Sequence, residues 1–170
     1  LRVVEQHFLS KRPVFLLHRL DREASGLVLI AHTQTAAAAF SKLISERRIS
    51  KDYLIRVKGQ LSAALLAAAE LNTALDGKAC QTQFSLRHYD ASRDQSWLDI
   101  VLISGRKHQI RRHFALAGHP VMGDPQYGQG NKDSAGLALQ AVRLSFTCPV
   151  KRQRQQFELP PALWLTAVNT

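Results

Sequence analysis

One aspartate near the start of the chain lies between two arginines, in the run LHRLDREASG (17–26). The neighbouring guanidinium groups of Arg19 and Arg22 should favour the ionised form of Asp21 and lower its pKa. An ionised carboxylate held in this way can act as a nucleophile at a sugar carbon. The same pattern also suits a structural ion pair that holds a turn. The spacing therefore makes Asp21 a candidate nucleophile with a structural alternative.

A second segment, GRKHQIRRH (105–113), carries four fixed positive charges at the start of an apolar-striped helix expected over 107–117. In that helix Arg111 can point inward toward a site, while the helix N-terminus favours anions. A solvated basic helix end would explain the charge equally well. His108 and His113 are five residues apart, not four as in helical metal motifs, so we expect no metal site. The candidate phosphate-binding residues here are Arg106, Lys107 and Arg112.

Two further segments are ambiguous when taken alone. Tyr53 lies in an alternating pattern over 53–57, where a tyrosine most often packs in a core. Its phenol could also stack on a base or relay a proton, although a usual pKa of about 10 makes it a poor base. Residues 118–128 form a glycine-punctuated loop that Asp124 could cap or brace.

The patterns around these segments predict an α+β fold with a mostly antiparallel sheet. Helices are expected at about 34–48, with Thr33 as the cap, at 61–71 and at 107–117, with Gly118 at the end of the last. Asp76 and Gly77 predict a turn. Residues 118–136 hold five glycines and two prolines and predict a long loop, a feature that often carries function. The expected strands are 27–31, which should be buried, and 53–57, 82–86, 97–103, 137–146 and 155–159.

Composition limits the classes of partner. The 170 residues suit one domain, and 23 Lys and Arg against 13 Asp and Glu give a net charge of +10. Such a surplus favours a polyanion, nucleic acid first and an acidic membrane surface second. Cys80 and Cys148, without a CxxC motif, argue against a disulfide scaffold or a cysteine zinc site. We find no signal peptide or membrane-length apolar run and expect a cytoplasmic protein.

Taken in order, four segments resemble the signatures of the RluA-type family of RNA pseudouridine synthases. Residues 18–26 are similar to H-R-L-D-x-x-T-S-G and residues 51–53 to K-x-Y. Residues 105–113 are similar to G-R-x-H-Q-I-R-x-H and residues 118–128 to G-x-P-x-x-G-D-x-x-Y-G. Four motifs in this order make a chance resemblance very unlikely.

The resemblance covers almost the whole chain, including the closing residues 139–161, but it has departures. Ala24 stands where the family usually has Thr, and the motif at 105–113 is more basic than usual. Neither an S4 RNA-binding domain nor the strand that usually precedes the aspartate motif is recognisable. We therefore expect residues 1–170 to form a pseudouridine synthase catalytic domain that lacks this N-terminal strand.

The resemblance implies an eight-stranded, bent, mostly antiparallel mixed sheet with flanking helices and a central basic cleft. It implies isomerisation of uridine to pseudouridine in structured RNA (rRNA or tRNA), without a metal or an organic cofactor. We also expect a monomer that binds no membrane. Asp21 corresponds to the catalytic aspartate, acting at ribose C1′ or uracil C6. Tyr53 corresponds to the active-site tyrosine and Arg111 to the arginine paired with Asp21. RNA contacts are expected from Arg19, Arg22, Arg106, Lys107, His108 and Arg112.

The alternative function is a catalytically silent basic RNA-binding module, which the net charge supports equally well. Such modules usually present aromatic side chains on which bases stack. None of the three tyrosines and two tryptophans lies within the basic runs. RNA binding without formation of pseudouridine would favour the module.

Overall fold

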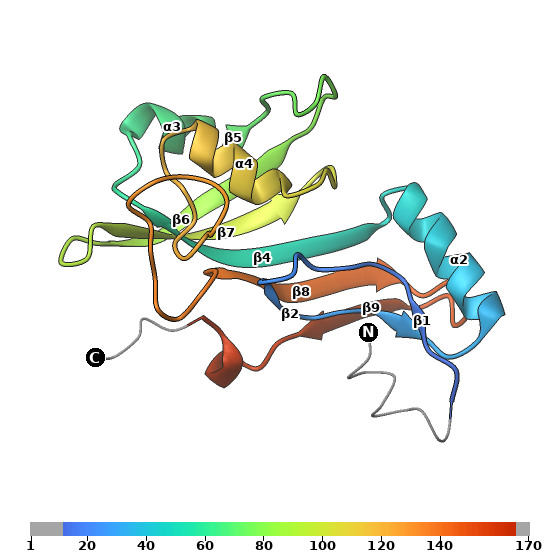
Figure 1. The fold of residues 1–170 in the computed structure, drawn as a ribbon. Helices are drawn as coiled ribbons and strands as arrows, with labels where there is room; N and C mark the ends of the chain where they lie inside the picture. Colours follow the sequence, from blue (N-terminus) through green and yellow to red (C-terminus); the bar gives the residue numbers. More distant parts are fainter. Residues whose placement is uncertain (1–11, 166–170) are drawn as a thin grey trace.

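The computed structural model describes residues 12–165, which form a long bent sheet with helices toward its two ends (Figure 1). The main sheet has seven strands in the order β2-β8-β4-β7-β6-β5, with β9 also paired to β8. Only the pairing of β2 with β8 is parallel within the described residues. The strands are β1 (Phe15–Leu16), β2 (Ser25–Gly26), β3 (Ile30–Ala31), β4 (Ile49–Lys58), β5 (Glu70–Leu71), β6 (Thr82–Asp90), β7 (Gln95–Leu102), β8 (Leu139–Thr147) and β9 (Arg154–Glu158).

This architecture confirms the predicted α+β class and mostly antiparallel sheet. It differs from the eight-stranded expectation, because β1 and β3 pair with each other in a separate two-stranded sheet. No strand was predicted before the motif that contains Asp21. Residues 1–11 lie outside the described residues, and the two-residue strand β1 follows at 15–16. No helix within residues 12–165 is long and apolar enough to span a membrane.

The helices begin and end at recognisable signals. Thr33 caps α2 (Gln34–Ser45) as predicted, since its hydroxyl accepts a hydrogen bond from the Ala36 amide at 3.1 Å. The second helix is shorter than predicted: α3 (Ala63–Ala68) stops at Ala69, whose φ of 54° is left-handed. The remaining helices are α4 (Gln109–Leu116), which ends before Gly118 as predicted, and the 3-10 turn η1 (Pro161–Leu163).

Apolar packing fixes two helices to different parts of the sheet. Phe114 of α4 packs edge-to-face on Phe84 of β6, with ring centroids 5.5 Å apart. Phe40 of α2 packs in the same way on Phe146 of β8, at 5.2 Å. Each fully buried side chain of this kind stabilises the fold by about 1.5–3 kcal/mol. Consequently α3 and α4 cover the β6–β7 end, and α2 lies at the opposite end (Figure 1).

The prediction of one buried strand over 27–31 is wrong. Only Ile30 and Ala31 pair as a strand, and Val28 is 41% exposed. The Leu27 amide donates to Ala141 on the main sheet, whereas the Leu29 carbonyl accepts from Leu17 beside the small sheet. The segment therefore crosses from one sheet to the other instead of running through the core.

Gly26, just before this crossing, brings the backbone of β2 against β8. Its φ of 108° lies in the region that only glycine adopts without strain. A Cβ atom at this position would overlap the backbone of Ala141. Gly26, the last residue of the motif at 18–26, thus allows β2 to approach β8 closely. This contact fixes the end of the loop that carries Asp21.

Candidate active site

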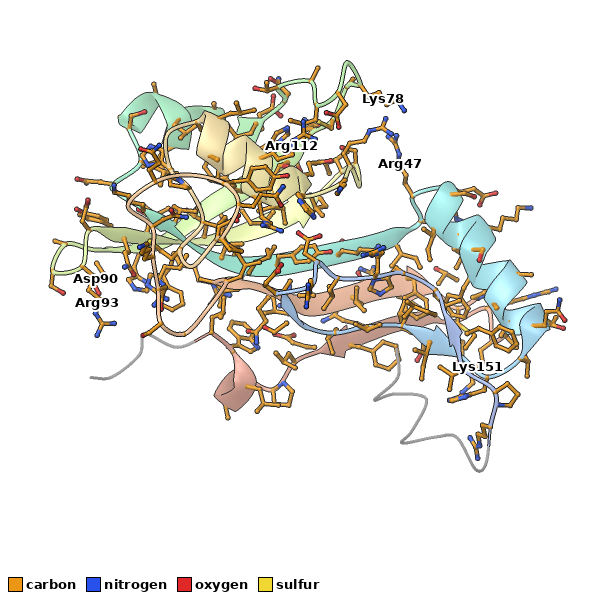
Figure 2. All side chains as sticks on the ribbon, in the orientation of Figure 1. Arg47, Lys78, Asp90, Arg93, Arg112 and Lys151 are labelled. Carbon is orange, nitrogen blue, oxygen red and sulfur yellow. The ribbon has the colours of Figure 1, made fainter. Side chains whose placement is uncertain are left out.

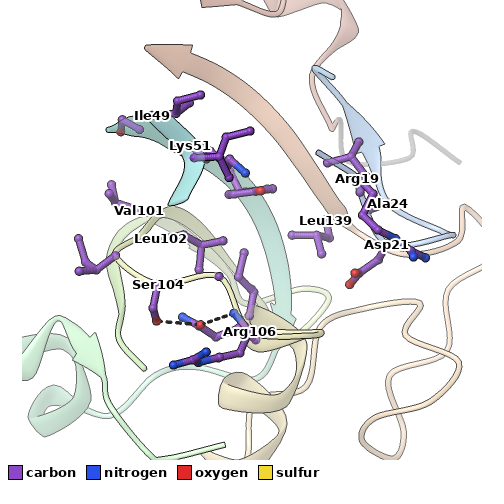
Figure 3. A pocket seen from close by; sticks show the side chains of 18 of the residues that line it. Arg19, Asp21, Ala24, Ile49, Lys51, Val101, Leu102, Ser104, Arg106 and Leu139 are labelled. Atoms are coloured by element: carbon purple, nitrogen blue, oxygen red, sulfur yellow. Dashed lines mark hydrogen bonds between the residues drawn. The ribbon is translucent and has the colours of Figure 1, made fainter. Parts of the chain in front are cut away.

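A cleft of about 1410 Å³ lies over β4, between the end of α2 and the start of α4. Figure 3 shows that its walls come from separate parts of the chain. Asp21 and Arg19 precede β2, Lys51 belongs to β4, and Arg106 precedes α4. Among the described residues, the charged groups that line the cleft are nine lysines and arginines and two carboxylates, Asp21 and Glu23. It is therefore the central basic cleft that the resemblance implied.

The buried guanidinium of Arg111 joins two aspartates. Its Nε and Nη2 donate to the two carboxylate oxygens of Asp124, each at 2.7 Å. Its remaining nitrogen, Nη1, lies 3.4 Å from Oδ2 of Asp21. The side chain of Asp21 keeps 25% of its surface exposed, whereas those of Arg111 and Asp124 keep 2% and 0%. Asp21 therefore faces the cleft while the other two lie beneath it.

Electrostatics keeps the buried pair ionised. The hydrogen bonds that Arg111 donates to Asp124 hold the pKa of Arg111 above its usual value. Burial alone would raise the pKa of Asp124, but the hydrogen bonds from Arg111 and from the Gln126 and Tyr127 amides outweigh it and lower the pKa. Asp124 thus braces its loop, as predicted, and also orients Arg111. Sequence reasoning missed this second role because the two residues lie in different motifs.

Tyr53 enters the floor of the cleft from β4 and is 8% exposed. Burial and the negative charge of Asp21 raise the pKa of Tyr53 to about 12. The phenol therefore keeps its proton near neutral pH and suits stacking or hydrogen-bond donation better than proton abstraction. Burial also lowers the pKa of Lys51, two residues earlier on the same strand.

His18, the first residue of the motif at 18–26, is a structural residue. Its Nε2 accepts a hydrogen bond from the Leu29 amide at 3.1 Å. Burial, with a contribution from the charge of Lys51, lowers the pKa of His18 to about 4. The neutral ring therefore fixes the chain on both sides of the Asp21 loop.

His108 lies beside Asp21, although the resemblance assigned it to RNA. Its Nε2 is 3.9 Å from Oδ1 of Asp21, and its Nδ1 is 3.0 Å from the hydroxyl of Tyr127. The left-handed backbone of His108, with φ at 52°, sets this orientation and delays the start of α4 to Gln109. Tyr127 also lies under Arg111, whose guanidinium carbon is 5.1 Å from the ring centroid. Tyr127 is a second residue that sequence reasoning missed.

The remaining candidates separate into residues that line the cleft and one residue, Arg112, that does not. Arg19 and Arg22 line the cleft, but within residues 12–165 neither forms an ion pair with Asp21. The cationic partner of Asp21 is Arg111, ninety residues away in the chain, which is the pairing that the resemblance implied. Arg112 is not among the lining residues, and both of its terminal nitrogens donate to Asp76 at 2.8 Å. Arg106 and Lys107 line the cleft.

Metal ligands are not clustered in this site. In the part of the chain that the structure describes, no group of three His, Cys, Asp or Glu side chains is placed to hold a metal ion. His113 is buried, with its Nε2 2.9 Å from the Thr73 carbonyl and its Nδ1 3.0 Å from the Thr82 hydroxyl. Both of its nitrogens are therefore engaged in the fold.

Comparison with known proteins relates the chain to one family. The family model for RNA pseudouridylate synthase matches residues 4–116. An uncharacterised RNA pseudouridine synthase of Mycoplasma genitalium is 30% identical, over 89% of this chain and 53% of its own length. Ribosomal large subunit pseudouridine synthase C of Escherichia coli (strain K12) is 32% identical, over 85% of this chain and 52% of its own. The chain thus spans about half the length of these curated relatives.

A solved structure shares the fold. Human RNA pseudouridylate synthase domain containing 1 superimposes with a TM-score of 0.76, over 98% of this chain and 81% of that one. The identity is 22%, so this similarity concerns the fold alone. It confirms the predicted fold class. The roles of the individual site residues stay predictions.

The buried pair gives a prediction for stability. Asp124→Asn keeps the size of the side chain but removes the carboxylate that makes the two shortest contacts with the buried Arg111, and it leaves only the longer contact with Asp21. Loss of one partner of a buried ion pair costs about 3–5 kcal/mol in the free energy of unfolding. Urea denaturation measures the loss. Asp76→Asn, which removes the exposed partner of Arg112, is the control and should leave the midpoint unchanged. Equal effects of the two substitutions would contradict this role of Asp124.

The same pair predicts a pH dependence. Because the pKa of Asp124 is lower in the folded protein, its stabilisation is complete above the unfolded value of about 3.9. It is lost as the pH falls through the folded value. The advantage of the wild type over Asp124→Asn should therefore be full at neutral pH and shrink in acid.

Proposed function

The chain belongs to the RNA pseudouridylate synthase family, and from this membership we propose that it isomerises specific uridines in structured RNA to pseudouridine. One observation carries the proposal: the carboxylate of Asp21 faces a basic cleft while a buried guanidinium holds it from below. The cations favour the polyanionic backbone of RNA. The carboxylate supplies the chemistry that a passive binding module would not need.

The reaction exchanges one bond of the nucleoside for another. The ionised Asp21 attacks ribose C1′, and the glycosidic bond to uracil N1 breaks, as in other carboxylate-assisted glycosyl transfers. The uracil rotates, its C5 displaces Asp21 from C1′, C5 loses its proton and N1 gains one. Attack by Asp21 on uracil C6 is the alternative first step. In both routes Arg111 orients the carboxylate and places a fixed positive charge beside it.

Tyr53 and the cleft cations prepare the substrate. The target base must leave its stack to enter the site, at a cost of a few kcal/mol. Because Tyr53 keeps its proton, we assign it to stacking on the uracil rather than to removal of the C5 proton. Phosphate contacts from four of the cations that line the cleft offset the cost of base flipping. These are Arg19, Arg22, Arg106 and Lys107.

The substrate class follows from the relatives. The Escherichia coli relative acts, by its name, on the large ribosomal subunit, so we propose large-subunit rRNA as the first RNA to test and tRNA as the second. We further propose that residues 1–170 form one catalytic domain that acts as a monomer, without metal or organic cofactor, in the cytoplasm. Cys80 and Cys148 are free thiols, which suits a reducing compartment.

Asp21→Asn tests the proposed reaction. Asparagine keeps the shape but cannot act as the carboxylate, so single-turnover formation of pseudouridine should fall at least about 10³-fold, the scale of losing a nucleophile. Release of tritium from RNA labelled at uracil C5 measures the rate. The dissociation constant for RNA should change by less than about threefold, since one contact with the flipped base contributes little beside the phosphates.

Asp99→Asn is the matched control, because Asp99 pairs with Arg87 on the exposed sheet surface, 2.7 Å away, and does not line the cleft. It should keep the wild-type rate. Full turnover by Asp21→Asn would exclude Asp21 as the catalytic group. RNA binding by a wild-type protein that modifies no cellular RNA would instead favour the binding module.

His108 gives a second test. A role in orienting Asp21 affects kcat, whereas a contact with RNA affects KM. If Tyr127 donates to Nδ1, the proton on Nε2 faces Asp21 and helps to orient it. His108→Asn, which tolerates the left-handed backbone, should then lower kcat by about tenfold or more and change KM little. Tyr127→Phe should lower kcat in the same direction. A raised KM with an unchanged kcat would return His108 to a role in RNA binding.

A further inference from the structure

The cleft extends well beyond the uridine site. Its volume of about 1410 Å³ exceeds the range of about 300–1,000 Å³ that encloses most small ligands. The cleft runs along β4 from Tyr53 to Ile49, and these four residue steps span about 13 Å at about 3.3 Å per residue. A ligand that fills it must therefore be longer than one nucleotide.

The far part of the cleft has the chemistry of a phosphate-binding surface. Two arginines follow α2, one begins β9, and two hydroxyl side chains end β8. Within residues 12–165, no carboxylate lines this part of the cleft. Guanidinium groups and hydroxyls are the usual protein partners of phosphate and sugar oxygens. We call this group the arginine end: Arg47, Arg48, Ser145, Thr147 and Arg154.

Two of these arginines are unpaired. Among the described residues, the side chains of Arg47 and Arg154 form neither a hydrogen bond nor an ion pair, while Arg48 contacts only the exposed Glu46 at 3.3 Å. Other surface arginines are engaged in ion pairs, such as Arg87 with Asp99 and Arg112 with Asp76. In Figure 2 Arg47 extends from the end of α2 toward the part of the molecule that carries Lys78 and Arg112. The arginine end therefore has cationic groups available for an external anion.

The floor below these cations does not offer a base-reading surface. Ile49 and Phe146 are each 7% exposed, because they pack against Leu43 of α2. Bases are bound by exposed aromatic platforms, which this part of the cleft does not provide within the described residues. The ligand is thus recognised by its charge and its sugar-phosphate backbone rather than by its sequence.

From these observations we infer that the arginine end binds the backbone phosphates of the RNA strand that flanks the target uridine, several nucleotides away from it. The inference rests on the proposed function for the nature of the substrate. Neither Arg47 nor Arg154 belongs to the motifs that suggested that function. Their contribution is to affinity and to the path of the RNA, and the chemical step does not use them.

The test uses the full chain and an RNA that carries the target uridine, prepared at full length and shortened on either flank. Arg47→Ala combined with Arg154→Ala should raise the dissociation constant by about tenfold or more, as expected for two lost charge-assisted contacts. The slope of log K against log salt should become shallower by about 0.7–0.9 per arginine. The single-turnover rate at saturating RNA should stay within about twofold of wild type. Arg87→Ala, which removes one arginine outside the cleft, should leave affinity and slope unchanged.

Shortening one flank of the RNA should abolish the difference between the double variant and the wild type, while shortening the other flank should preserve it. An unchanged salt slope, an effect that survives both truncations, or a lower rate at unchanged affinity would each overturn the inference. A wild type that binds RNA through Arg47 and Arg154 but forms no pseudouridine would refute the proposed function and leave the arginine end as an RNA-binding surface.

Discussion

The site depends on one buried cation. Arg111 has almost no contact with water, so its charge must be balanced within the protein, and Asp124 balances it with two parallel hydrogen bonds. Those bonds also fix the plane of the guanidinium and direct its third nitrogen toward Asp21. Of these three residues, Asp21 faces the cleft. It is held next to a guanidinium group whose orientation is fixed by Asp124.

The fold can be understood as the support for this arrangement. α4 carries Arg111 and packs on β6, the loop before β8 carries Asp124, and the Asp21 loop is held by Gly26 against β8. β4 joins both ends of the sheet and supplies Tyr53. Three segments that are far apart in the sequence therefore meet at one point because each is fixed to the same sheet.

Local patterns predicted the parts of the structure that local chemistry decides. The cap at Thr33, the end of α4 at Gly118 and the apolar stripe of that helix follow from short-range periodicity and were confirmed, since Ile110 and Phe114 of the stripe are buried. The resemblance paired Arg111 with Asp21, but the pairing of Arg111 with Asp124 and of Arg112 with Asp76 did not follow, because these aspartates lie 13 and 36 residues away and only the folded chain brings them together. The prediction of a strand over 27–31 was wrong because the apolar composition of this segment does not reveal that the chain crosses there from one sheet to another.

The central claim is that the planar fork of Arg111 holds Asp21 for chemistry, and the single-turnover rate of Arg111→Lys tests it most directly. Lysine keeps the charge but cannot bond Asp124 twice and reach Asp21 as well. For a variant shown to be folded, we expect the rate of pseudouridine formation to fall by about 100-fold or more, while the affinity for RNA changes by less than about threefold. A retained rate with weakened binding would mean that Arg111 serves the RNA backbone and would contradict the account.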